Sequence, residues 1–316
     1  MQSTMQDVPL TVAAILRYAS TVHGDRTVTT ATGDGYRHAT YREVGRQAAR
    51  LANALRRRGV EGDDRVATFM WNNQEHLEAY VAVPSMGAVL HTLNIRLFPE
   101  QIEFVAYEAE DRVVIADLSL APILAPVLPK METVHTVVAV GAGDLEPFQR
   151  SGKNVVRYHD ITAAESDQFD WPAIDEKSAA AMCYTSGTTG HPKGVVYGHR
   201  STYLHSTAVC SGNGMGLSFS DKAFPIVPMF HANAWGLPYA ALMAGADILL
   251  PDRHMDAKTL VHMIETQRPT VAGAVPTIWN DVMNYLEREP GHDISSLRLV
   301  ACGGSAVPMS LMKTFE

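Results

Sequence analysis

The segment that constrains this chain most is residues 182–200, MCYTSGTTGHPKGVVYGHR. An apolar, strand-like run precedes it, residues 185–191 are almost all glycine or hydroxyl-bearing, and Lys193 and a β-branched pair follow. Gly187 and Gly190 permit backbone conformations in which several amide N–H groups converge on one point. Together with hydroxyl groups and the Lys193 ammonium, such a loop offers the donors that a polyphosphate requires. The hydroxyl donors are Thr185, Ser186, Thr188 and Thr189.

Two other interpretations of this segment are weaker. A flexible Gly/Ser/Thr linker would not lie between two apolar strands and carry a lysine. A Walker A loop requires G-x-x-x-x-G-K-[ST] at the start of a helix. Here Pro192 and Gly194 flank Lys193, and a strand-like pattern follows. We therefore predict a phosphate-binding loop of a different kind.

Composition indicates a globular protein. The chain has 316 residues, of which 46% are hydrophobic and 19% charged, so it can bury the core of about two domains. Its formal net charge of -8 argues against nucleic acid as the main partner. The three cysteines are widely spaced and predict reduced thiols in a cytoplasmic protein. Residues 1–7 contain no apolar signal region, and no apolar run is long enough to span a membrane.

Strand and helix patterns alternate along the chain, which predicts an α/β fold with mostly parallel sheets. Thr40 and Glu43 form a capping-box pattern, and Gly59 ends the helix that follows. We expect further helices at 75–83, 99–107, 201–209, 234–243, 256–266 and 277–286. We expect strands at 65–70, 88–92, 113–116, 137–140, 223–227, 246–250, 270–274 and 297–302. The polar stretch 141–177 is predicted to connect two sheets, dividing the chain into subdomains 1–175 and 176–316.

Three loops that follow predicted strands carry unusual residues: 185–193, 228–235 and 303–308. In open α/β sheets, ligands bind where loops leave the carboxyl ends of strands. We therefore expect these loops to meet at one crevice. Taken alone, His231 could be an ordinary loop histidine, Trp235 a core residue, and the Gly-Gly-Ser of 303–305 a simple turn.

The order T-S-G-T-T-G-x-P-K-G closely resembles the phosphate loop of the adenylate-forming superfamily, which includes acyl-CoA synthetases, peptide-synthetase adenylation domains and luciferases. The segment PMFHANAWGLPYA, 228–240, resembles its medium- and long-chain fatty acyl-CoA synthetase branch. HTLNIRLFPEQ, 91–101, and ACGGSAVP, 301–308, resemble the same branch. The resemblance covers the chain from about residue 10 to residue 316.

This resemblance implies roles for individual residues. Residues 185–190 and Lys193 would bind ATP phosphates, with the Thr185 hydroxyl as one Mg²⁺ ligand. His231 would lie near the acyl carboxylate and the α-phosphate, and Trp235 would gate the acyl tunnel. The loop with Gly303, Gly304 and Ser305 would pack along adenine and the acyl group.

The resemblance also implies two packed, mostly parallel sheets with a small distorted β-barrel. Family members continue with a Y-G-x-T-E-like motif, a ribose-binding aspartate, a hinge and a small C-terminal domain that carries a lysine, and none of these occurs before Glu316. We therefore expect these 316 residues to fold but not to form acyl-CoA. Leu311, Met312 and Phe315 are expected to lack cover.

The function implied is an AMP-forming fatty acid–CoA ligase that uses ATP, Mg²⁺ and coenzyme A and passes through an acyl-adenylate. Alternatives are a ligase for a small acid such as a methylthio-alkanoate, transfer to a carrier protein, and a nucleotide-binding or dimerisation module without turnover. The sequence does not determine the oligomeric state, and a homodimer is one possible assembly. It contains no H-E-x-x-H, G-x-S-x-G or early G-x-G-x-x-G pattern.

Overall fold

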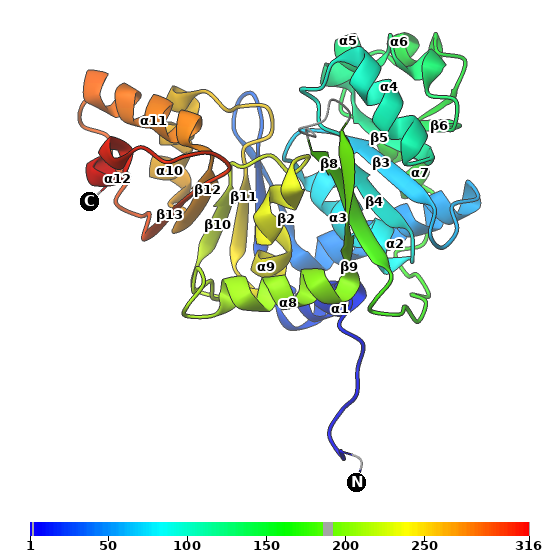
Figure 1. The fold of residues 1–316 in the computed structure, drawn as a ribbon, viewed down its shortest axis with the longest axis horizontal. Coiled ribbons are helices and arrows are strands. Elements are labelled where there is room, and N and C mark those ends of the chain that lie inside the picture. Colours follow the sequence, from blue (N-terminus) through cyan, green and yellow to red (C-terminus); the bar gives the residue numbers. More distant parts are fainter. Residues whose placement is uncertain (2, 186–191, 316) are drawn as a thin grey trace.

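A computed structural model describes residue 1, residues 3–185 and residues 192–315. In this part of the chain, two β-sheets stand side by side, with helices between them and on both outer faces (Figure 1). Most neighbouring strands are parallel, as expected when helical crossovers connect them. The predicted α/β fold with two packed sheets is confirmed.

The described strands of the first sheet number seven, and we call it the seven-stranded sheet. From edge to edge they are β7 (Asn154–Arg157), β6 (Thr136–Val140), β5 (Asp111–Asp117), β3 (Arg65–Phe69), β4 (Val89–Thr92), β8 (Ala179–Thr185) and β9 (Lys193–Gly198). All pairs are parallel except β8 with β9. The strands that flank the predicted phosphate loop therefore form an antiparallel pair at one edge.

The second sheet, with six strands among the described residues, is called the six-stranded sheet. Its order is β13 (Leu299–Cys302), β12 (Val271–Ala274), β10 (Lys222–Pro225), β11 (Asp247–Leu250), β1 (Thr27–Ala31) and β2 (Tyr36–Thr40). The hairpin β1–β2 comes from the N-terminal part of the chain and pairs with β11. Each sheet thus draws strands from both sides of residue 175, and the division into 1–175 and 176–316 stays a prediction.

Helices complete the layers. They are α1 (Val12–Val22), α2 (Tyr41–Arg57), α3 (Gln74–Ser85), α4 (Pro99–Glu108), α5 (Ala121–Leu124), α6 (Glu146–Gln149), α7 (Tyr158–Ala163), α8 (His199–Cys210), α9 (Leu237–Ala244), α10 (Ala257–Gln267), α11 (Pro276–Arg288) and α12 (Met309–Phe315). Helices α1, α2, α3 and α9 share one buried core with strands of both sheets. Helices α4 and α5 pack on the other face of the seven-stranded sheet, and α10, α11 and α12 on that of the six-stranded sheet.

Helix α2 begins at the predicted capping box. The Thr40 hydroxyl accepts a hydrogen bond from the Glu43 amide, and the Glu43 carboxylate accepts one from the Thr40 amide at 2.7 Å. Two backbone donors at the helix start are thereby satisfied.

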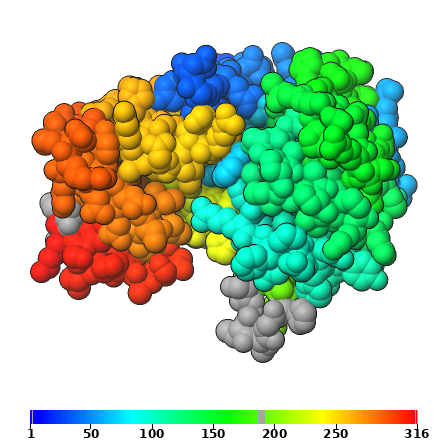
Figure 2. All heavy atoms as spheres, turned by 90° about the horizontal axis from the view of Figure 1, so that it is seen from above, coloured from blue at the N-terminus to red at the C-terminus, as the bar shows by residue number. Residues whose placement is uncertain are grey.

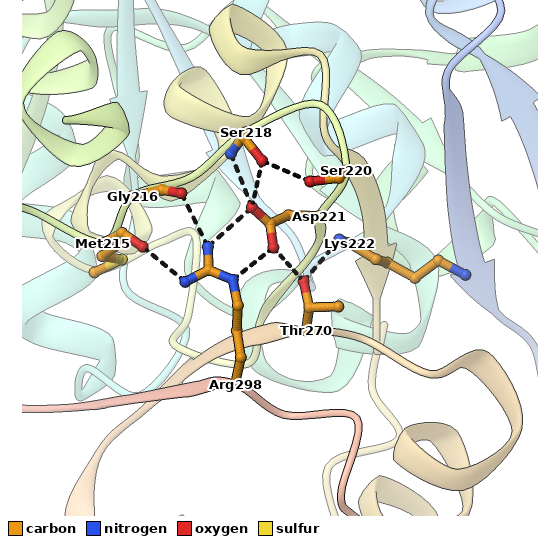
Figure 3. A network of polar contacts seen from close by, with 8 residues as sticks. All are labelled: Met215, Gly216, Ser218, Ser220, Asp221, Lys222, Thr270 and Arg298. Atoms are coloured by element: carbon orange, nitrogen blue, oxygen red, sulfur yellow. Dashed lines mark hydrogen bonds and ion pairs between the residues drawn. The ribbon is translucent and has the colours of Figure 1, made fainter. Parts of the chain in front are cut away.

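A polar network joins the amino ends of β10, β12 and β13 (Figure 3). The Arg298 guanidinium donates two hydrogen bonds to the Asp221 carboxylate, at 2.7 and 2.9 Å. Thr270 and Ser218 donate further hydrogen bonds to the same carboxylate. Burial opposes ionisation of Asp221, but these hydrogen bonds outweigh it and hold its pKa well below the ordinary value. The network ties the loop after α8 to three strands.

Residues 141–177 do not connect the two sheets, so that prediction was wrong. They contain α6, β7 and α7, and β6, β7 and β8 all lie in the seven-stranded sheet. Strand β7 has four residues at a sheet edge, and none of them is fully buried. An edge strand of this kind carries little hydrophobic signal in the sequence.

The prediction that α12 leaves its apolar residues uncovered was wrong for two of them. Leu311 is only 4% exposed and belongs to the core beside α11. The ring of Phe315 meets the buried Trp279 edge-on, with ring centroids 5.4 Å apart. Met312 is exposed, as expected. The described strands form two open sheets, and the small barrel implied by the resemblance stays a prediction.

Candidate functional site

The predicted phosphate loop lies between β8 and β9. Thr185 is the last residue of β8 and is half-buried, and Lys193 is the first residue of β9 and is exposed. The two stand opposite each other in the antiparallel register. Ser186, Gly187, Thr188, Thr189 and Gly190 lie outside the described residues. A hydroxyl and a cation therefore face one another at the base of the loop.

A buried histidine–carboxylate pair lies beside the end of β8. His91 on β4 lies 2.8 Å, through its Nδ1, from the carboxylate of Asp111, and both side chains are completely buried. The ring of Tyr184, which precedes Thr185, lies 5.2 Å from the His91 ring. The histidine of the HTLNIR segment thus lies in the core beside Tyr184 and is not exposed.

The segment after β10 is positioned by residues of the seven-stranded sheet. Asn72, which follows β3, donates hydrogen bonds to the carbonyl groups of Pro225 and Val227 at 2.8 and 2.9 Å. Its side-chain oxygen accepts one from the Met229 amide at 2.8 Å. The hydroxyl of Tyr80 on α3 donates to the Met229 carbonyl group. Asn72 is buried, so these bonds hold the 228–235 loop to the neighbouring sheet.

Asn72 was missed in the sequence analysis. The signal that could have found it is the Trp-Asn-Asn sequence directly after a predicted strand, where the rule applied to the other loops also holds.

The helix expected at 234–243 begins later than predicted, at Leu237, because a left-handed turn occupies residues 232–236.

Residues 232–236 form a left-handed turn. The φ angles of Ala232, Asn233, Ala234 and Trp235 are 44°, 49°, 50° and 54°, and that of Gly236 is 67°. Residues other than glycine usually visit this region singly, because each costs about 1–2 kcal/mol there. Strained backbone of this kind persists only where surrounding contacts impose it, and it is concentrated at functional sites.

His205 on α8 is one of these contacts. Its Nε2 lies 2.9 Å from the Trp235 carbonyl oxygen. A Cβ atom at Gly236 would lie 2.5 Å from the same imidazole ring, so only glycine fits there. His231 comes immediately before the turn and is exposed, with its amide donating to the Pro228 carbonyl group at 3.1 Å.

Trp235 joins this turn to the loop after β13. A Cβ atom on Gly303 would lie 3.7 Å from the indole, and one on Gly304 3.9 Å from it. Ser305 follows and is exposed. The predicted meeting of the 228–235 and 303–308 loops is confirmed at this contact. The Cys183 thiol of β8 lies 3.7 Å from the hydroxyl of Tyr197, which lines the cavity beside Trp235.

A cavity of about 390 Å³ opens beside Trp235. Its walls come from β9, α8, the left-handed turn and α9, and they are largely apolar. The lining residues are Tyr197, Ser201, Thr202, His205, Ala232, Asn233, Trp235, Gly236 and Tyr239. On a larger scale, the molecule is hollowed between the red and orange C-terminal elements and the cyan part of the seven-stranded sheet (Figure 2).

Within residues 3–185 and 192–315, no three His, Cys, Asp or Glu side chains gather closely enough to hold a metal ion. No helix among the described residues is both long and apolar enough to cross a membrane.

Comparison with solved structures finds the same fold in an anthranilate–CoA ligase, AuaEII, in complex with anthranoyl-AMP. The TM-score is 0.86 at 24% identity, and the match covers 100% of this chain and 59% of the other. A protein-family model described as AMP-binding enzyme matches residues 16–316. The chain therefore belongs to the AMP-binding enzyme family.

Two curated relatives are more similar in sequence. A long-chain-fatty-acid–CoA ligase of Thermus thermophilus is 41% identical over 315 residues, which are 99% of this chain and 56% of the relative. A 3-methylmercaptopropionyl-CoA ligase of Ruegeria lacuscaerulensis is 37% identical over 317 residues, covering 100% and 58%. The chain thus spans less than three-fifths of the length of each.

Proposed function

We propose that the protein containing this chain is an AMP-forming acid–CoA ligase, and that these residues provide the adenylate-forming part of its site. The observation that carries the proposal is the position of Trp235. It contacts the Gly303–Gly304 loop and lines an apolar cavity. A nucleotide site and an acyl site would meet at this residue.

In the first half-reaction, the acid's carboxylate attacks the α-phosphorus of ATP, and pyrophosphate leaves. The carboxylate is already ionised, so no general base is required. Catalysis then consists of positioning and of neutralising phosphate charge. In the second half-reaction, the thiolate of coenzyme A attacks the acyl carbon and AMP leaves.

The described residues fit these tasks. Lys193 is exposed at the base of the loop, free to approach the β- and γ-phosphates together with the donors of 186–190. His231 is exposed beside the Trp235 turn, where the acyl carboxylate would meet the α-phosphate. Gly303, Gly304 and Ser305 would line the adenine side.

A magnesium ion fits the donor chemistry at Thr185. Mg²⁺ prefers oxygen ligands and keeps several water molecules in its shell, so one half-buried hydroxyl at a strand end is a suitable single ligand. When bound, the ion would neutralise phosphate charge. Thr185 would orient it, and Lys193 would add a second positive charge.

The acid is proposed to be a fatty acid, as for the Thermus relative, with a small methylthio acid as the alternative named by the Ruegeria relative. A panel of acids should be tested for acid-dependent exchange between ATP and pyrophosphate, and then for CoA thioester, using the full-length gene product. Exchange with fatty acids supports the first proposal, and exchange confined to the methylthio acid supports the second. Inertness with every acid would support a binding module without turnover.

A further inference from the structure

We propose that Tyr239 is the inner stop of the cavity beside Trp235, and that the acid therefore has a short or medium-length tail with an apolar end. This inference rests on the proposed function, because it takes the cavity as the acyl site. It concerns which acids fit, and not whether they are adenylated.

The cavity has an open end and a closed end. Ser201 and His205 on α8 are exposed and lie at its opening. Tyr239 on α9 also lines the cavity but is only 1% exposed, so it forms the inner wall. Asn233, 6% exposed, lies beside it. An acyl chain that fills the cavity from its opening inward would therefore end against the Tyr239 ring.

Tyr239 is fixed in place and cannot swing aside as a gate would. Its hydroxyl donates a hydrogen bond to the Tyr80 carbonyl oxygen at 3.0 Å. Its ring stacks on that of Tyr80, with centroids 5.4 Å apart and planes 29° from parallel. Tyr80 is in turn bonded to the Met229 carbonyl group. Moving Tyr239 would break these contacts together.

Four polar groups that line the cavity are already engaged within the protein. The hydroxyls of Ser201 and Thr202 donate to the Gly198 carbonyl oxygen at 2.8 and 3.0 Å. His205 Nε2 is engaged with Trp235, and the Tyr239 hydroxyl with Tyr80. The amide oxygen of Asn233 has no partner, but protein atoms cover it. A polar tail would therefore lose its hydrogen bonds to water without replacement.

Size and ring content specify the tail further. A volume of about 390 Å³ lies near the lower end of the roughly 300–1,000 Å³ usual for small-molecule sites. Three aromatic rings, from Tyr197, Trp235 and Tyr239, line it. Such rings pack well against methylene groups and against a thioether sulfur. The geometry thus fits an unbranched alkyl or thioether tail of limited length.

The test is a calorimetric binding series of saturated acids from butanoate to hexadecanoate on the 316-residue chain. Affinity should rise about fourfold per methylene group while the chain fills the cavity. It should stop rising at a medium chain length, and we call this length the break. In Tyr239→Ala the break should move to longer acids, whereas Tyr239→Phe, which keeps the ring, should keep the break. A break that does not move in a folded Tyr239→Ala protein would overturn the proposal.

A second measurement tests whether Tyr239 is the inner stop if Tyr239→Ala does not fold. On the unmodified chain, an acid with a terminal hydroxyl should bind about tenfold more weakly than the alkyl acid of equal length. Equal binding, or affinity that rises steadily to hexadecanoate, would refute the stop. The proposed function fails separately, if the full-length protein shows no acid-dependent pyrophosphate exchange although the break in binding is present.

Discussion

At the amino ends of β10, β12 and β13, Asp221 and Arg298 satisfy one another and every strand is tied by hydrogen bonds. At the carboxyl ends of the same strands, four consecutive non-glycine residues hold left-handed backbone, and the Asn233 amide oxygen lacks a partner. At the amino end the buried carboxylate is paired with a cation, whereas the carboxyl end carries strained backbone. The difference indicates that the amino end contributes stability, and it supports the proposed ligand site at the carboxyl end.

The largest effect should come from breaking the paired end. Asp221→Ala removes a buried carboxylate that accepts hydrogen bonds from three side chains. The free energy of unfolding should fall by about 3 kcal/mol, measured by urea denaturation, and ATP affinity should stay unchanged. Asp221→Asn is the control and should lose less, because it keeps the shape and one acceptor. An unchanged urea midpoint in Asp221→Ala would contradict this assignment.

Lys193→Ala should produce the converse result. Lys193 is exposed, so its loss should leave the urea midpoint unchanged. ATP binding should weaken by roughly ten- to a hundredfold, since one charge-assisted contact contributes about 1.5–3 kcal/mol. Lys177→Ala, at another exposed lysine, is the matched control for nucleotide titration. If both variants bind ATP equally well, Lys193 is not a phosphate ligand.

The strained turn can be tested at Gly236. Gly236→Ala places a methyl group at positive φ and against the His205 ring. It should lower the free energy of unfolding by about 1–2 kcal/mol. Gly33→Ala, where nothing lies within 4 Å of the added atom, is the control and should change little. Equal urea midpoints for the two variants would show that the turn is not held as described.

The pKa of a buried carboxylate shifts in the other direction where no cation is paired with it. Glu78 on α3 accepts hydrogen bonds from Tyr158 and Gln74. Burial, and then the charge of Glu75, raise its pKa, which is the opposite of Asp221. Because the folded state holds this proton more tightly, stability should be greatest below the ordinary glutamate pKa and decline as pH rises through the raised value.

The decline should not exceed about 1.4 kcal/mol per pH unit, which is the limit for one proton. Urea denaturation between pH 5 and pH 8, an interval that brackets the raised pKa of Glu78, would measure the decline. Glu78→Gln should flatten this part of the pH profile. A profile identical to that of the unmodified chain would locate the dependence elsewhere.

Local signals made much of the fold predictable. Thr40 and Glu43 predict the start of α2, and the apolar and β-branched residues on either side of 185–193 predict β8 and β9. The loops after β10 and β13 were expected to meet because parallel strands end at one edge, and they do so at Trp235.

The turn at 232–236 could not be predicted from local preference. Alanine and tryptophan seldom adopt positive φ, and the contacts that impose it come from distant segments, such as His205. The role of Tyr239 was hidden for a related reason, because an apolar helix such as α9 shows only that its residues are buried. For Asn72, the sequence indicates only that it follows a strand, and not which distant backbone groups its three hydrogen bonds reach.

The position of the β1–β2 hairpin has a consequence for how the chain matures during synthesis. Thr27 bonds to Asp247, 220 residues later, so β1 cannot find its neighbour until β11 has left the ribosome. At about 5–20 residues per second, this delay is roughly 10–40 s. During that time the edge of β1 that faces away from β2 is unpaired and can join another nascent chain. We expect newly made protein to depend on holdase chaperones during this interval, however stable the finished sheet becomes.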